Sequence, residues 1–286
     1  MLLLDGKATA LNIRQELKAT IADLCGKGLR APGLAVILAG NNPASEIYVS
    51  NKEKACSEAG IRTMTSRLPA NVEQAQLLEL IAQCNQRDDI DGILVQLPLP
   101  AHINTADCLL RIVPDKDVDG FHPENAGRLT LGLPGLRPCT PQGIMELLAR
   151  YGLSCAGKSA VVVGRSNIVG KPLALMLAQP GPTGNATVTI CHSRSQDLAE
   201  HCRNADFLFL SVGRPKMFGP EMVKKGACVI DVGINRSQNG ICGDVDFEAI
   251  KDIVSAISPV PGGVGPMTIA MLIRNTVQAW QNHLGL

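Results

Sequence analysis

The sequence predicts an α/β protein built from two domains. Short apolar runs alternate with stretches of helical periodicity, which is the pattern of folds with parallel sheets. A loop-rich segment at 113–141 interrupts this alternation, and the alternation then begins again. A chain of 286 residues is long enough for two domains of ordinary size.

The composition is that of a soluble globular protein, with 45% hydrophobic and 19% charged residues. A net charge of +1 and 3% aromatic residues argue against nucleic-acid binding. No apolar run is long enough to span a membrane, so we expect no membrane partner. None of the ten cysteines forms a C-x-x-C pair, so we expect reduced thiols, a cytoplasmic location and no metal site.

The elements of the first domain follow from local signals. Asn42 is a suitable N-cap, and Pro43 can occupy the first turn of a helix over about 43–60. The other elements are a helix over about 8–27, a strand at 33–40, a helix at 72–86 and a strand at 91–100.

The second domain repeats the alternation after Thr140 and Pro141, which we interpret as another N-cap and first-turn proline. We place this Rossmann-like, doubly wound domain at 141–265 and assign 1–140 plus 266–286 to the first domain. The strands are at 159–164, 186–192, 206–212 and 228–233, and the helices are at 169–179, 195–205, 220–226 and 265–284.

A glycine turn joins the first strand of the second domain to its helix. The segment reads G-x-S-x-x-x-G from Gly164 to Gly170, with Arg165 and Ser166 inside it. Backbone N–H groups at such a turn can bind a pyrophosphate. Because the middle glycine of G-x-G-x-x-G is missing, an ordinary strand–turn–helix glycine is the alternative. The position at the first βα junction favours a dinucleotide.

The end of the next strand indicates which dinucleotide. NAD sites usually carry an acidic residue there, whereas this strand ends in His192, Ser193 and Arg194. Arg194, Ser193 and Arg165 suit a ribose 2′-phosphate, so we expect NADP as cofactor. The alternative is that these are solvated loop residues.

Tyr48 and Lys52 lie four residues apart in the helix predicted over 43–60. Their side chains would project from one face, one turn apart. This spacing fits either a solvated surface pair or two groups directed at one substrate.

Several segments together resemble one enzyme family. They include "NPASEIYVSNKEKACSEAGI", "DGILVQLPLP", "PDKDVDGFHPENAGRL", "GRSNIVGKP" and "PVPGGVGPMT". In this order, over about residues 5–280, the chain resembles the bifunctional methylenetetrahydrofolate dehydrogenase/cyclohydrolases. The resemblance implies oxidation of 5,10-methylenetetrahydrofolate with NADP, hydrolysis of the 5,10-methenyl product to 10-formyltetrahydrofolate, a folate site in a cleft between the domains, and a homodimer.

The resemblance also implies roles for individual residues. Lys52 would take a proton from water and must then be uncharged, Gln96 would hold its amine, Tyr48 would orient the water, and Asp119 would anchor the pteridine. Asp117 is expected only to cap its loop. The remaining substrate-binding positions are Val95, Leu97, Pro261, Gly262, Gly263 and Val264, and the cofactor-binding positions are Gly164, Arg165, Ser166, Ser193, Arg194 and Ile234.

Three other functions share part of this pattern. A short-chain dehydrogenase also uses Y-x-x-x-K, but there the pair follows the glycine turn, whereas Tyr48 and Lys52 precede it. A monofunctional NAD-dependent methylenetetrahydrofolate dehydrogenase would not need Lys52 and Gln96 for hydrolysis. A non-catalytic dinucleotide-binding sensor would not need an intact folate site.

Overall fold

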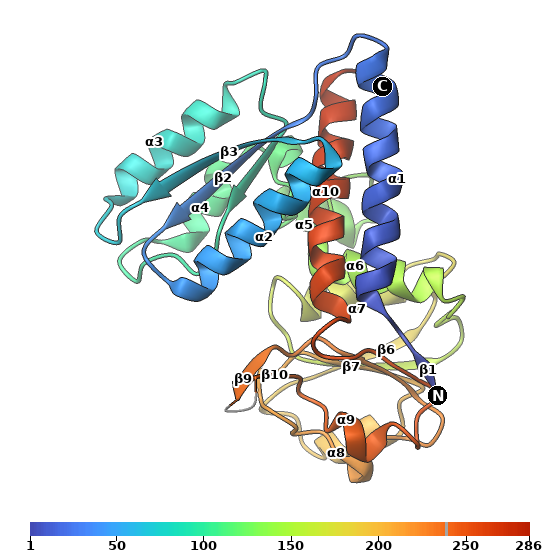
Figure 1. The fold of residues 1–286 in the computed structure, drawn as a ribbon. Coiled ribbons are helices and arrows are strands. Elements are labelled where there is room, and N and C mark those ends of the chain that lie inside the picture. Colours follow the sequence, from blue (N-terminus) through green and yellow to red (C-terminus); the bar gives the residue numbers. More distant parts are fainter. Residues whose placement is uncertain (238–239) are drawn as a thin grey trace. The chain divides into compact units, whose positions relative to one another are not determined.

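The computed structural model describes residues 1–237 and 240–286, and the chain divides into two compact units (Figure 1). Unit 1 comprises residues 1–11 and 140–268, and unit 2 comprises residues 12–139 and 269–286. Each unit contains a parallel sheet with helices, so the predicted two-domain α/β class is confirmed.

Unit 2 contains a three-stranded parallel sheet in the order β3-β2-β4. The central strand β2 is buried along its whole length, as expected for a strand covered on both faces. Its alternate residues Ala35, Ile37 and Ala39 pack with apolar residues of α3 and α4 in one core cluster. The strands are β2 (Gly33–Ala39), β3 (Arg62–Leu68) and β4 (Gly92–Val95).

The helices of unit 2 begin and end largely at local signals. Helix α2 (Pro43–Ala59) follows Asn42, whose side chain accepts hydrogen bonds from the Ala44 and Ser45 N–H groups. Its C-cap is Gly60, which has a φ of 91°. The predicted N-cap and proline of α2 are therefore confirmed. The others are α3 (Gln74–Asn85), α4 (Thr105–Arg111), η1 (Pro114–Lys116) and α5 (Pro123–Thr130), with parts of α1 (Gly6–Gly26) and α10 (Val264–His283).

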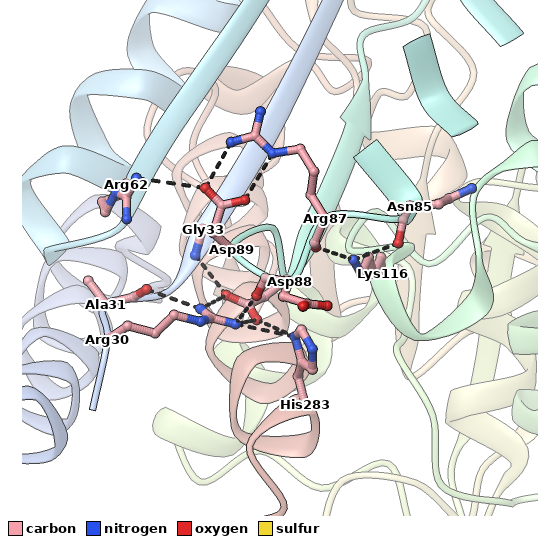
Figure 2. A network of polar contacts seen from close by, with 11 residues as sticks. Arg30, Ala31, Gly33, Arg62, Asn85, Arg87, Asp88, Asp89, Lys116 and His283 are labelled. Carbon is pink, nitrogen blue, oxygen red and sulfur yellow. Dashed lines mark hydrogen bonds and ion pairs between the residues drawn. The ribbon is translucent and has the colours of Figure 1, made fainter. Parts of the chain in front are cut away.

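A buried carboxylate ties the C-terminal helix to the start of β4 (Figure 2). Asp91 accepts hydrogen bonds from both terminal nitrogens of Arg30 at 2.7 and 2.6 Å. It also bonds the Gly33 N–H at 2.8 Å and Nδ1 of His283, near the end of α10, at 2.9 Å. Burial acts to raise the pKa of Asp91, but these partners outweigh it and the net shift is downward.

Unit 1 contains a six-stranded parallel sheet in the order β1-β11-β8-β7-β5-β6. Strand β5 pairs with β6 on one side and β7 on the other, which is the switch point of a doubly wound fold. The strands are β1 (Leu2–Leu3), β5 (Ser159–Val163), β6 (Thr187–Cys191), β7 (Phe207–Leu210), β8 (Cys228–Asp231) and β11 (Ala256–Ile257).

The remaining elements of unit 1 lie mostly between these strands. They are α6 (Cys139–Arg150), α7 (Gly170–Ala178), α8 (Leu198–Arg203), η2 (Pro220–Met222), α9 (Phe247–Ile250) and the hairpin strands β9 (Asn235–Ser237) and β10 (Gly240–Cys242). The apolar core includes Val161, Leu208 and Val229 of the central strands.

The structure differs from the sequence-based expectations at several places. Helix α6 begins at Cys139, so the prediction of Thr140 as N-cap is wrong; its hydroxyl instead lies 3.0 Å from that of Thr268. Strand β3 was missed because this half-exposed edge strand lacks an apolar run. The short helix α5 was missed inside the predicted loop, and the helix expected at 220–226 is reduced to the single turn η2.

The first eleven residues group with unit 1, whereas the sequence placed them with residues 12–140. The physical reason is strand pairing, because Leu2 and Leu3 of β1 lie opposite Ala256 and Ile257 of β11. The assignment of folate to one domain and NADP to the other stays a prediction.

Candidate functional site

Two side chains meet at the carboxyl end of the unit 2 sheet. Gln96 directly follows β4, and its N–H donates to the carbonyl of Ile37 at 2.9 Å. Lys52 projects from α2, which follows β2, and is only 5% exposed. Its Nζ donates to Oε1 of Gln96 at 3.1 Å, and Nε2 of Gln96 donates to the Leu97 carbonyl at 2.6 Å. The predicted pairing of Lys52 with Gln96 is therefore present.

Tyr48 lies on the same face of α2 as Lys52. The Lys52 Nζ atom is 5.2 Å from the centre of the Tyr48 ring, within the range of a cation–π contact. Burial raises the pKa of the Tyr48 phenol, and the charge of Asp119 adds to this rise. Because Lys52 is buried, the alternative of a solvated surface pair is wrong.

Asp119 comes from the segment beside β4. Asp117 forms a parallel bridge with Ile93, so the chain runs along β4 and brings Asp119 to the end of the sheet where Gln96 lies. Desolvation raises the pKa of Asp119 to about 6, with the charge of Lys52 opposing this rise and that of Asp117 adding to it. These mutual effects place Asp119 in one electrostatic cluster with Lys52 and Tyr48.

Asp117 caps its loop, as the sequence predicted. Its buried carboxylate accepts hydrogen bonds from the His122 N–H at 2.8 Å and from Nδ2 of Asn125 at 3.0 Å.

Of the other predicted substrate positions in unit 2, Val95 is buried and Leu97 is half-buried. Unit 2 therefore gathers an amine, an amide, a phenol and a carboxyl, which suits proton transfer to or from a held water or substrate.

A cavity of about 270 Å³ in unit 1 lies at the carboxyl ends of β5, β6 and β7. Gly164 has a φ of 129°, and a Cβ on Gly170 would come within 2.1 Å of the Gly164 carbonyl oxygen, so this turn needs glycine at both places. Among the described lining residues are Arg165, Ser193 and Arg214, and none is acidic. The turn and its positive charges fit the phosphates of a dinucleotide.

Of the predicted cofactor residues, Ser166, Arg194 and Ile234 do not line this cavity. The hydroxyl of Ser166 accepts hydrogen bonds from the N–H groups of Val169 and Gly170 at 3.1 and 3.3 Å, so it holds the start of α7. Arg194 is exposed and stays a predicted cofactor residue. Arg214 was missed by the sequence reasoning, although a cationic residue after β7 is a usable signal.

A second cavity of unit 1, of about 160 Å³, brings together Ile234 and the segment from Pro261 to Val264. All these residues were predicted from sequence, Ile234 for the cofactor and the others for the substrate. Ile234 is 57% exposed, and Gly262 has a φ of 107°, which a residue with a side chain rarely adopts. This cavity offers an apolar side chain and a close backbone approach to a flat ring.

Two buried carboxylates shape the loops of unit 1, and the sequence reasoning missed both. Asp231 accepts hydrogen bonds from the N–H groups of Gly233, Asp244 and Val245, and burial raises its pKa to about 6. Asp244 accepts from three consecutive N–H groups at 212–214 and from Nδ2 of Asn235. The signals in the sequence were the single acidic residue of "VIDVG" and the first acidic residue of "GDVD".

The described residues contain neither a metal-binding cluster nor a membrane-spanning helix. Within 1–237 and 240–286, no set of three or more His, Cys, Asp or Glu residues is arranged to hold a metal ion. In the same residues, no helix has both the length and the apolar character needed to cross a bilayer.

The doubly wound sheet and glycine turn of unit 1 define a protein of the dinucleotide-binding class. The family description "Tetrahydrofolate dehydrogenase/cyclohydrolase, catalytic domain" matches residues 4–119, and "Tetrahydrofolate dehydrogenase/cyclohydrolase, NAD(P)-binding domain" matches residues 138–284. The chain belongs to the tetrahydrofolate dehydrogenase/cyclohydrolase family.

Individual relatives agree with this assignment. The "Bifunctional protein FolD" of Desulfovibrio desulfuricans is 63% identical over 283 residues, which is 99% of each chain. The crystal structure of the bifunctional FolD enzyme of Campylobacter jejuni has a TM-score of 0.95 and 51% identity, covering 99% of each chain. The Trypanosoma brucei FolD enzyme, solved with NADP and an inhibitor, has a TM-score of 0.93 and 38% identity, covering 100% of this chain and 99% of that one.

Proposed function

We propose that this chain is a bifunctional folate enzyme. It oxidises 5,10-methylenetetrahydrofolate with NADP and hydrolyses the resulting 5,10-methenyl cation to 10-formyltetrahydrofolate. The observation that carries the hydrolytic half is the buried amine of Lys52, 3.1 Å from Gln96 and 5.2 Å from the Tyr48 ring. Family membership supports both halves and argues against a monofunctional NAD enzyme or a non-catalytic sensor.

The first step needs positioning more than acid–base chemistry. Bound NADP supplies the hydride acceptor. Arg165, Ser193 and Arg214 bind its phosphates, and Ile234 with the 261–264 segment contacts flat rings. The Asp119 carboxylate accepts hydrogen bonds from the pteridine and so fixes the one-carbon bridge.

The second step needs a base beside a cation. Once its amine carries no proton, Lys52 accepts a proton from water as the water oxygen attacks the methenyl carbon. The hydroxyl proton of this adduct then moves to N5 as the C–N5 bond breaks, which leaves the formyl group on N10. Gln96 accepts a hydrogen bond from the amine and holds it without adding charge. Tyr48, one turn away, orients the water. The step consumes one water and releases one proton.

The test is Lys52→Met, which keeps the length of the side chain and removes the amine. Hydrolysis of methenyltetrahydrofolate should fall by at least about a hundredfold, which is the low end for loss of a general base. A coupled measurement of NADPH and 10-formyltetrahydrofolate separates the two steps. Lys54→Met, at an exposed position two residues along α2, is the matched control and should be fully active. Undiminished hydrolysis by Lys52→Met would exclude this role.

We also propose a cytoplasmic enzyme that assembles as a homodimer. Ten unpaired thiols, most of them buried, are typical of a reducing compartment. Light scattering on the purified protein measures the assembly, and cell fractionation measures the location. A monomer in solution, or a membrane or exported fraction, would contradict these proposals.

A further inference from the structure

Helix α10 carries a fully buried asparagine among apolar neighbours. Asn275 is 0% exposed, and so are the nearby Ile273 and Trp280. An amide in such a place is unfavourable unless it is hydrogen-bonded. Nδ2 of Asn275 donates to the carbonyl oxygens of Val118 and Arg137, both at 2.8 Å. Because both partners are acceptors, the NH₂ group must face them.

The two carbonyls belong to segments that are far from α10 in the sequence and in contact with each other. Val118 lies in the "KDVDG" segment, and its carbonyl also accepts from the Cys139 thiol at 3.2 Å. A Cβ on Gly120 would come within 2.3 Å of the Arg137 carbonyl carbon, so these backbones are packed directly together. Asn275 therefore donates a hydrogen bond to each of two backbone segments, at Val118 and Arg137, that pack against each other.

Asp119 directly follows Val118, whose carbonyl accepts the hydrogen bond from Asn275. The carbonyl of Val118 and the nitrogen of Asp119 share one planar peptide group, so fixing the carbonyl fixes where the Asp119 backbone starts. On the preceding side, Asp117 is held by its bridge to Ile93 and its bonds to His122 and Asn125. Within residues 1–237 and 240–286, the backbone N–H and carbonyl of Asp119 form no hydrogen bond of their own, so the Val118 peptide is what holds this backbone.

The cost of burying Asn275 points away from a purely stabilising role. Its Oδ1 is buried and has no hydrogen-bond partner within residues 1–237 and 240–286. An unsatisfied buried acceptor costs about 1–3 kcal/mol, which offsets much of what the two donated bonds contribute. An apolar side chain of similar size would remove this unsatisfied acceptor, but it could not hold the Val118 and Arg137 carbonyls.

We propose that Asn275 is a positioning residue for the folate reaction, acting through the Val118 peptide to hold Asp119 in place. It touches neither substrate nor cofactor. This inference rests on the proposed function, because it assumes that Asp119 anchors the pteridine.

The test is a double-mutant cycle on the full chain. Asn275→Leu should raise the KM for methylenetetrahydrofolate at least about tenfold, because small misplacements of a binding group can cost up to about a hundredfold. The Kd for NADP should not change. In an Asp119→Asn background, Asn275→Leu should have little further effect on the folate KM, since residues that act through one another are not additive.

Controls keep the outcomes distinct. Thr276→Val alters the next residue of α10, whose buried hydroxyl bonds only within the helix to the Leu272 carbonyl, and it should leave the folate KM unchanged. Fluorescence of Trp280, the single tryptophan, checks that unit 2 is folded. Asn275→Ser, which keeps a hydroxyl donor, should give an intermediate KM and serves if the leucine variant does not fold.

The outcomes separate the role of Asp119 as pteridine anchor from the role of Asn275 as positioning residue. If Asp119→Asn leaves the folate KM unchanged, the role of Asp119 in the proposed function fails. If Asp119→Asn raises the KM but Asn275→Leu does not, or if the two effects add fully, the positioning role of Asn275 is overturned. If neither Asn275 variant folds, the residue is a folding determinant and the inference is likewise overturned.

Discussion

Asp91 is the place where a single side chain should matter most for the stability of unit 2. Its side chain is 0% exposed and accepts bonds from Arg30, Gly33 and His283 (Figure 2). Asp91→Ala removes the carboxylate from these donors, although Arg30 keeps its bonds to the Ala31 and Asp88 carbonyls. Removing one partner of a buried ion pair costs about 3–5 kcal/mol. Because Arg30 is 28% exposed and water can partly replace the carboxylate, we expect the low end, about 3 kcal/mol.

Urea unfolding followed by Trp280 fluorescence measures this loss, because the single tryptophan is buried in α10 within unit 2. A loss of about 3 kcal/mol corresponds to a Tm lower by about 6–12 °C for a domain of about 150 residues. Asp89→Ala is the matched control: Asp89 also pairs with arginines but its side chain is 38% exposed, so its variant should match the wild type within error.

The pH dependence gives a second check on Asp91. Because its pKa is lowered in the folded state, its stabilisation is present above the unfolded pKa and is lost as the pH falls through the folded pKa. The difference between wild type and Asp91→Ala should persist down to about pH 5 and close below about pH 4. A variant within about 1 kcal/mol of the wild type at neutral pH would refute the reasoning.

Further predictions concern the two sites. The pKa of Asp119 is raised to about 6 by burial, so its ionised form opposes folding at neutral pH; Asp119→Asn should be more stable than the wild type there and lose this advantage between about pH 6 and pH 4 in urea unfolding. Arg165→Ala should weaken 2′,5′-ADP by about 10–100-fold and 5′-AMP much less in calorimetry; equal effects would contradict a 2′-phosphate contact. Arg194→Ala should raise the KM for NADP more than that for NAD, and an unchanged ratio would exclude Arg194. Asp244→Asn should weaken NADP binding at least about tenfold, because one of the two oxygens that accept from the 212–214 N–H groups becomes an NH₂ donor, while binding of folate analogues by unit 2 should be retained.

Local signals in the sequence determined most of the elements of the fold. Asn42 and Pro43 define the start of α2 because a cap and a first-turn proline act within a few residues. Alternation of apolar runs and helical stretches predicted both sheets, and the glycine turn at 164–170 located one cavity. Strand β3 was not predicted, because an edge strand can be polar and still pair along one side.

The motif residues of the candidate site were also readable from sequence, but their surroundings were not. The pairing of Lys52 with Gln96 spans 44 positions, that of Arg30 with Asp91 spans 61, and that of Asn275 with Val118 spans 157. A buried carboxylate or amide in the sequence has many possible partners, and only the packed chain selects one. The sequence by itself therefore indicated which groups are candidates for the chemistry. The tertiary structure decided which backbone and ion-pair contacts hold them, because hydrogen bonds and burial depend on distances that only folding sets.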